Sequence, residues 1–158
     1  DKAQTLTQEG LGAVRQSVAA LRESPLGKRP LPEAISALVT ESNNAGIVTE
    51  LVVRGTPHHL ASNEELALYR VAQEGLTNIR KHARASRADL LLDYTDPTKV
   101  CLSIVDNGLG AEETTNGFGL LGVRERVHLL GGQVTVKTAV NQGFSLMVCL
   151  PTAVKEIT

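Results

Sequence analysis

Two pairs of strand-like runs, each joined by a short polar turn, constrain the fold of this chain more than any other feature. Residues 87–94 and 100–106 flank Asp96-Pro97-Thr98, and residues 133–139 and 144–150 flank a turn at 141–143. Runs separated by so few residues pair as antiparallel hairpins, because a parallel return needs a long crossover. A doubly wound parallel sheet, which requires strict alternation of strands and helices, is therefore excluded.

The remaining segments have helical periodicity or are single strands. A helix is expected from Leu31 to Ala45, ending at Gly46, followed by a strand at 47–54. Ser62 or Asn63 is expected to cap a helix that runs to about His82, and a further helix follows the glycines at 117–122. Helices mixed with hairpins predict an α+β fold: a two-layer α/β sandwich with helices on one face of a mixed sheet.

The first part of the chain is expected to be separate from this sandwich. Residues 3–23 read as a helix with a heptad-like seam, which also suits a plain amphipathic helix. A joint rich in proline and glycine follows. We therefore assign residues 1–24 to an appended helix, 25–30 to a linker and 31–158 to the main domain. The seam consists of Leu11, Val14, Val18 and Leu21.

Composition excludes several classes of function. The net charge of −1 gives no electrostatic basis for binding nucleic acid or an anionic membrane. No apolar stretch of about eighteen residues is present. Only 3% of residues are aromatic, so the core must be aliphatic. Cys101 and Cys149 lack metal-type spacing, and we expect them to be reduced thiols of a cytoplasmic protein.

Three segments carry residues suited to chemistry, and the first is the helix that contains Glu74 and Asn78. These side chains lie one turn apart, beside an apolar stripe. An amide oxygen is a suitable hard ligand for Mg²⁺, and a carboxylate can accept a proton. A solvated helix face with ordinary polar pairs explains the same pattern.

The second segment is Asp106-Asn107-Gly108-Leu109-Gly110, directly after an apolar strand. Strand alternation places Asp106 on the same face as Leu102 and Ile104. If that face is covered, the carboxylate needs a hydrogen-bond donor, which the exocyclic amine of adenine can supply. An ordinary turn after a strand remains the alternative.

The third segment is a glycine-rich loop, residues 117–122, that opens an amphipathic helix. Free N–H groups at such a helix start suit phosphates. The loop lacks the Gly-Lys-Ser/Thr ending of a Walker A motif, and it does not follow the first strand of a Rossmann unit. Alone, it is a weak motif.

In this order, the three segments resemble the N, G1 and G2 boxes of the GHKL ATPase superfamily (Bergerat fold). The helix segment at 69–83 and the loop segment at 119–126 are most similar to sensor histidine kinases with a HisKA_3-type dimerisation domain, such as nitrate sensors and the membrane-fluidity sensor. The resemblance covers residues 31–151. It implies ATP and Mg²⁺ as cofactors and transfer of the γ-phosphoryl group to a histidine.

The resemblance also implies a role for each matching residue. Asn78 corresponds to the Mg²⁺ ligand, Glu74 to the catalytic base and Asp106 to the adenine anchor. Lys81 and His82 correspond to the basic end of the N box, near the phosphates. The other residues implied in ATP binding are Gly108, Gly110, Gly117, Gly119, Leu120 and Leu121.

Two features depart from the family pattern. Phe144 stands where many members have a threonine, and packing explains it. No histidine has the acceptor context, so we expect a fragment cut after the acceptor helix, with the 1–24 helix as the second helix of the dimerisation hairpin. The chain's histidines are His58, His59, His82 and His128.

The resemblance implies several partners and a location. The partners are ATP or ADP, a dimerisation helix pair with the acceptor histidine, and a response regulator, within a homodimeric full-length protein. The domain would be cytoplasmic, in a protein that a membrane anchor would suit. The alternatives are an anti-sigma-factor-type serine kinase and a non-catalytic ATP-dependent switch.

Overall fold

The computed structural model describes residue 26 and residues 29–109, 120–138 and 143–152. The helix expected at 3–23 and its seam lie outside these residues. So do three of the glycines expected to contact ATP, which are Gly110, Gly117 and Gly119.

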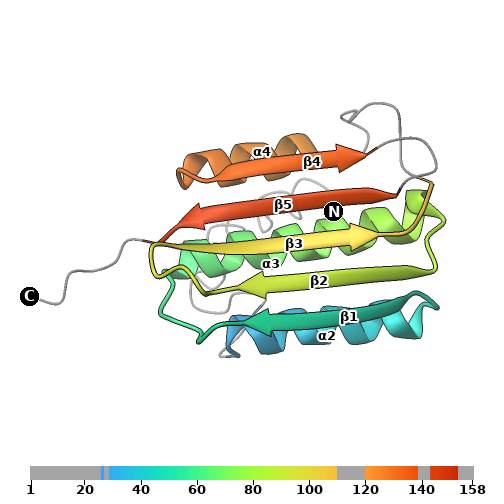
Figure 1. Cartoon of the computed structure of the whole chain (residues 1–158), viewed down its shortest axis with the longest axis horizontal. Helices are drawn as coiled ribbons and strands as arrows, with labels where there is room; N and C mark the ends of the chain where they lie inside the picture. Colours follow the sequence, from blue (N-terminus) through green and yellow to red (C-terminus); the bar gives the residue numbers. More distant parts are fainter. Residues whose placement is uncertain (1–25, 27–28, 110–119, 139–142, 153–158) are drawn as a thin grey trace, which may run out of the picture.

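The described strands form one sheet in the order β1-β2-β3-β5-β4. β1 is parallel to β2, and every other neighbouring pair is antiparallel, so the expected mixed sheet is confirmed (Figure 1). β5 lies between β3 and β4, which places the two predicted hairpins side by side. The strands are β1 (Val48–Arg54), β2 (Arg87–Asp93), β3 (Lys99–Asp106), β4 (Gln133–Thr138) and β5 (Phe144–Pro151).

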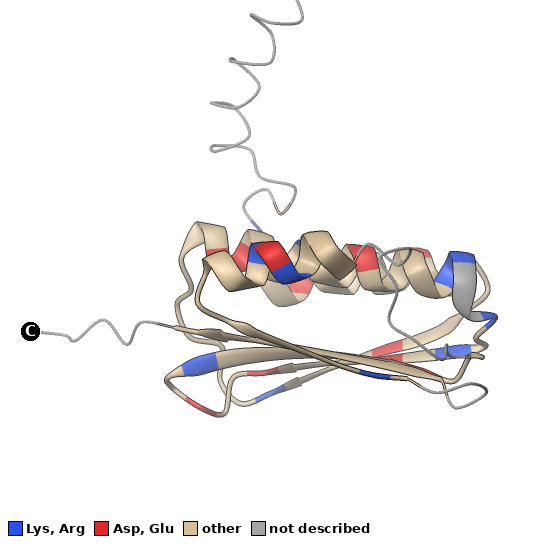
Figure 2. Cartoon of the chain, turned by 90° about the horizontal axis from the view of Figure 1, so that it is seen from above, with Lys and Arg blue, Asp and Glu red and all other residues tan. Residues whose placement is uncertain are grey.

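The described helices cover one face of the sheet and leave the other face open (Figure 2). This arrangement confirms the two-layer α+β sandwich. The long helix α3 continues into a short π-helix, η1, and the π turn was not expected from the sequence. The helices are α2 (Leu31–Asn44), α3 (Ser62–Asn78), η1 (Ile79–Ala83) and α4 (Leu120–Leu129).

The core lies between the helices and the covered face of the sheet, and it is aliphatic as expected. In β3, alternate residues face the helices, so Leu102 and Ile104 are almost fully buried. Gly75 lets α3 approach this strand closely, since a Cβ atom there would lie 2.5 Å from Cδ1 of Ile104. The helix that carries Glu74 and Asn78 is therefore seated directly on β3.

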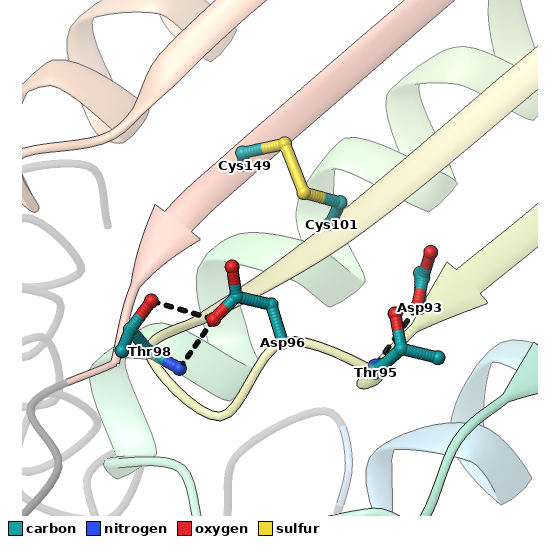
Figure 3. Close-up of a disulfide and its surroundings, with 6 residues drawn as sticks. All are labelled: Asp93, Thr95, Asp96, Thr98, Cys101 and Cys149. Atoms are coloured by element: carbon teal, nitrogen blue, oxygen red, sulfur yellow. Dashed lines mark hydrogen bonds between the residues drawn. A yellow bond between two sulfur atoms is a disulfide. The ribbon is translucent and has the colours of Figure 1, made fainter.

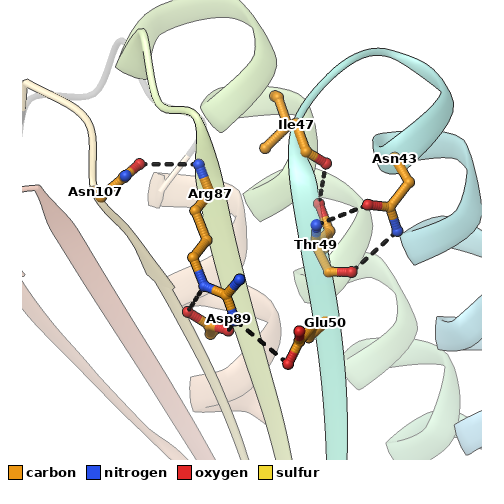
Figure 4. Close-up of polar contacts among 7 residues, drawn as sticks. All are labelled: Asn43, Ile47, Thr49, Glu50, Arg87, Asp89 and Asn107. Atoms are coloured by element: carbon orange, nitrogen blue, oxygen red, sulfur yellow. Dashed lines mark hydrogen bonds and ion pairs between the residues drawn. The ribbon is translucent and has the colours of Figure 1, made fainter.

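Backbone groups at two positions form hydrogen bonds with side chains that the sequence did not reveal. The side-chain amide of Asn43 donates to the carbonyl of Thr49 and accepts from its N–H, which pairs part of the outer edge of β1 (Figure 4). The expected cap at Ser62 or Asn63 is wrong. Ala61 is the N-cap residue, because the chain stays extended up to that point, and its N–H donates to the carboxylate of Glu64.

The two cysteines are joined in a disulfide, so the expectation of two reduced thiols is wrong (Figure 3). They are 48 residues apart in the sequence, but they face each other across the β3–β5 pair. Local sequence spacing could not reveal this contact, because it depends on which strands are neighbours in the sheet.

Gly143 precedes β5 with a φ of +75°, and a Cβ atom there would overlap the carbonyl oxygen of Asp106. Gly46 has a φ of +96° with nothing within 4 Å of the same position, so it is a matched control. We predict that Gly46→Ala costs about 1 kcal/mol of unfolding free energy through backbone strain alone. Gly143→Ala should cost at least about 2 kcal/mol more, because buried backbone must move. Chemical denaturation of both variants measures this difference, and equal losses would contradict the close contact.

Candidate functional site

Asp106 is a buried carboxylate at the end of β3, with 5% of its surface exposed. Its Oδ1 atom accepts a hydrogen bond from the N–H of Gly108 at 2.7 Å. Its Oδ2 atom is buried and has no hydrogen-bond partner among the described residues. Burial raises the pKa of this carboxyl group, and the bond from Gly108 only partly opposes that shift.

A buried acceptor without a partner is unfavourable, so its presence needs a physical reason. A ligand that brings an N–H donor to Oδ2 supplies one. The sequence-based expectation that Asp106 lies on the covered face is confirmed. Gly108, whose N–H donates to the carboxylate, is also buried.

Asn107 fixes the position of this turn, a role that the sequence analysis did not assign. Its Oδ1 atom accepts a hydrogen bond from the N–H group of Arg87 at 2.9 Å (Figure 4). The same atom accepts a second bond from the N–H group of Ser86 at 3.0 Å. Its Nδ2 atom donates to the hydroxyl of Ser86. The turn after β3 is thereby tied to the segment that leaves η1 and enters β2. The Asp-Asn-Gly pattern indicated a turn, but the partner of the Asn side chain is twenty residues away in sequence.

The polar edge of α3 ends on the same side of the molecule as Asp106. Glu74 and Asn78 are half-buried there, and Lys81 is exposed on η1. Two contacts hold this arrangement. Gly75 packs closely against Ile104, and Asn107 is hydrogen-bonded to Arg87 in the segment that follows η1. π-helical turns are frequent at functional sites. His82 is also part of η1, but its side chain lies outside the described part of the structure.

The start of α4 supplies the last described residues of the predicted site. Leu120 is buried in the core, whereas Leu121 is 52% exposed. Leu120 therefore anchors the helix, and only Leu121 is available for outside contacts. Phe144 is directly opposite Asp106 in the β3–β5 ladder and packs partly against the core, as its alternation with Leu146 predicted.

The arrangement defines a class of protein. Residues 63–154 match the family model of histidine kinase-, DNA gyrase B- and HSP90-like ATPases, so the chain belongs to that family. The matched region includes α3, the turn at Asp106 and α4. The fold and the relatives together define a histidine-kinase-type ATP-binding domain.

Particular relatives narrow the likeness to sensor kinases. The chain is 32% identical to the histidine-protein kinase/phosphatase DegS of Brevibacillus brevis, with 96% of this chain and 40% of the relative covered. It is 38% identical to UhpB of Salmonella typhimurium, over 94% of this chain and 30% of the relative. A crystal structure of full-length ShkA in complex with AMPPNP has a TM-score of 0.62 and 25% identity, over 78% of this chain and 29% of that one. The chain thus spans less than half of the curated relatives it matches.

Among the described residues, no group of three or more His, Cys, Asp or Glu side chains could hold a metal ion. In the same part of the chain, no helix combines the length and apolar character needed to cross a bilayer.

The raised pKa of Asp106 predicts a pH-dependent cost in the nucleotide-free protein. Its folded-state pKa lies above its ordinary value of 3.8, so the ionised carboxylate reduces stability as pH rises through the folded-state pKa. Asp106→Asn removes a buried charge and should raise the melting temperature at about pH 7, with a benefit that disappears at low pH. Thermal unfolding at several pH values measures it.

Asp93 is the matched control, because its pKa is lowered by two hydrogen bonds from Thr95. Its carboxylate stabilises the fold above the ordinary pKa of 3.8, and this contribution is lost as pH falls. Asp93→Asn should therefore lower the melting temperature near neutrality. Parallel stability profiles for wild type and Asp106→Asn would show that the carboxylate is not desolvated.

Proposed function

We propose that this chain is the ATP-binding catalytic domain of a two-component sensor histidine kinase. It would transfer the γ-phosphoryl group of ATP to a histidine on a dimerisation helix supplied by another part of the full-length protein. The observation that carries the proposal is the buried, unpartnered Oδ2 of Asp106. This atom lies on the same side of the molecule as the end of α3 that carries Glu74 and Asn78. Relatives that cover nearly all of the chain are named histidine kinases, which supports this activity.

Adenine can supply the hydrogen-bond donor that Asp106 lacks. Its exocyclic amine donates a hydrogen bond that Oδ2 lacks, and its flat ring suits a site walled by the backbone of Gly108. Guanine has a carbonyl in place of that amine, so it would face the carboxylate with a second acceptor. The site should therefore select adenine over guanine.

The phosphates would extend from adenine toward the end of α3. Lys81 would contribute positive charge there, and His82 would also lie near the phosphates. Backbone N–H groups at Gly117 and Gly119 would hold the phosphate oxygens, whereas Gly108 and Gly110 would shape the adenine pocket. Leu120 and Leu121 would complete the ATP site at the start of α4. Leu121 has the exposure for this contact, and Leu120 would act by anchoring the helix.

Asn78 suits Mg²⁺, because that ion prefers oxygen ligands and retains several waters. When bound, Mg²⁺ neutralises charge on the phosphates. Asn78 is half-buried on α3 and would orient the ion rather than enclose it.

Glu74 would act as the base that orients or deprotonates the accepting imidazole. It lies one helical turn before Asn78 and is also half-buried, so its carboxylate can face the site without full desolvation. The other proposed partners are a cognate response regulator and a second protomer in a homodimer. The cytoplasm is the proposed location, since ATP is available there.

Nucleotide selectivity tests the adenine assignment. Asp106→Asn should weaken ATP and ADP alike by about 1–3 kcal/mol, because a charge-assisted hydrogen bond is lost. GTP should compete poorly with ATP for the unaltered chain. Calorimetric titration measures each affinity. Asp96→Asn changes an exposed carboxylate in the β2–β3 turn and should have no effect. Equal binding of GTP and ATP would rule out Asp106 as the adenine anchor.

Phosphotransfer tests the kinase assignment. The chain, mixed with ATP, Mg²⁺ and a separately made acceptor helix pair, should place acid-labile phosphate on the acceptor and none on itself. Glu74→Gln should slow this step by roughly 10²–10⁴-fold with ATP affinity kept. Asn78→Ala should instead reduce Mg²⁺-dependent ATP affinity and spare Mg²⁺-free binding of ADP.

Two results would contradict this division of roles. If Glu74→Gln loses ATP affinity as severely as Asn78→Ala, Glu74 is a structural or metal-binding residue. If ATP binds but the acceptor gains no phosphate, the non-catalytic switch is the better account. Phosphate on a serine of an added substrate would favour the serine kinase.

A further inference from the structure

Cys101 and Cys149 are joined on the open sheet face, between the neighbouring strands β3 and β5. Cys101 lies on β3 and Cys149 is its direct partner on β5, with Cα atoms 4.1 Å apart (Figure 3). Antiparallel strands bring such partners closest at positions without mutual backbone hydrogen bonds, where Cα atoms are about 4.5 Å apart. The strand register therefore places the two cysteines where a disulfide can form.

A small reagent can reach this bond. Both cysteines are partly exposed, and they alternate with the buried residues of β3 and β5, so they lie on the sheet face opposite the helices. Their neighbours in the same cross-strand row are two polar residues, Asp93 on β2 and Gln133 on β4. No described element covers this face, so exchange does not require the core to open.

The β3–β5 ladder connects the disulfide to the proposed ATP site. This ladder continues from the cysteines to the pair formed by Asp106 and Phe144. The disulfide also closes a loop of 48 residues, and that loop contains Asp106 and the whole of α4. Breaking the bond frees this loop and leaves the β3–β5 register to backbone pairing and core contacts alone.

We propose that Cys101 and Cys149 form a thiol–disulfide exchange site for dithiol reductants, and that its redox state sets nucleotide affinity. The disulfide form holds β3 and β5 in register, which keeps Asp106 in its buried position. The dithiol form lets the ladder open more often, so fewer molecules present a complete adenine site. The effect on nucleotide rests on the proposed function, whereas the exchange site does not.

The exchange converts one disulfide and one dithiol into one dithiol and one disulfide. A thiolate of the dithiol attacks one cysteine sulfur, the S–S bond breaks, and its electron pair leaves on the other cysteine. The second thiolate of the dithiol then displaces the first cysteine. The reductant is oxidised to its own disulfide, and both cysteines take up protons as thiols. A disulfide oxidant reverses the sequence.

Thiol counting tests the exchange site without any nucleotide. After treatment with a disulfide oxidant, the native chain should show no reactive thiols. After dithiothreitol under native conditions, it should show both of its two cysteines. Reduction should also lower the melting temperature by about 5–15 °C. Thiols that stay reactive after the oxidant, or that appear only in denaturant, would overturn the site.

Calorimetric titration with ADP tests the coupling. The reduced chain should bind ADP at least about 5-fold more weakly than the oxidised chain, the low end of couplings between sites. The C101S/C149S variant is the matched control: it should bind like the reduced chain and ignore reductant. Equal affinities in the two redox states overturn the coupling. Binding in neither state overturns the coupling and the proposed function, while the thiol count still decides the exchange site.

Discussion

The buried carboxylate of Asp106 is the constraint on which the rest of the site depends. A charged oxygen without a donor is costly in a low-dielectric interior, and the bond that Oδ1 accepts from Gly108 offsets that cost only in part. Stability alone would favour a neutral side chain at this position. A ligand that supplies the missing donor removes this cost. An unpaired acceptor that is unfavourable in the protein alone therefore becomes the basis of selective binding.

Holding that carboxylate in place requires contacts from several distant parts of the chain. Gly108 donates to one oxygen, and Asn107 ties the turn to the start of β2. Gly143 packs against the backbone carbonyl of Asp106 from the β5 side. Gly75 lets α3 pack closely on β3 at Ile104, two residues before Asp106. The same contacts therefore position the proposed adenine anchor and the polar edge of α3 relative to each other.

Much of this arrangement was predictable because it depends on local periodicity. Alternation along β3 was enough to place Asp106 on the covered face, and the order of hairpins and helices was enough to predict a two-layer sandwich. Strand order was not predictable in the same way, since β5 inserts between β3 and β4 through contacts that no local pattern records. The pairing of Cys101 with Cys149 and the bonds of Asn107 to Ser86 depend on that nonlocal geometry, and both were missed.

The most direct test of the account is a crystal structure of this chain with ADP. The account predicts that the exocyclic amine of adenine lies within hydrogen-bond distance, about 2.7–3.2 Å, of Oδ2 of Asp106. Oδ1 should keep its bond from Gly108. An adenine ring bound elsewhere, with Oδ2 still unpartnered, would contradict the claim that this buried oxygen exists to bind nucleotide.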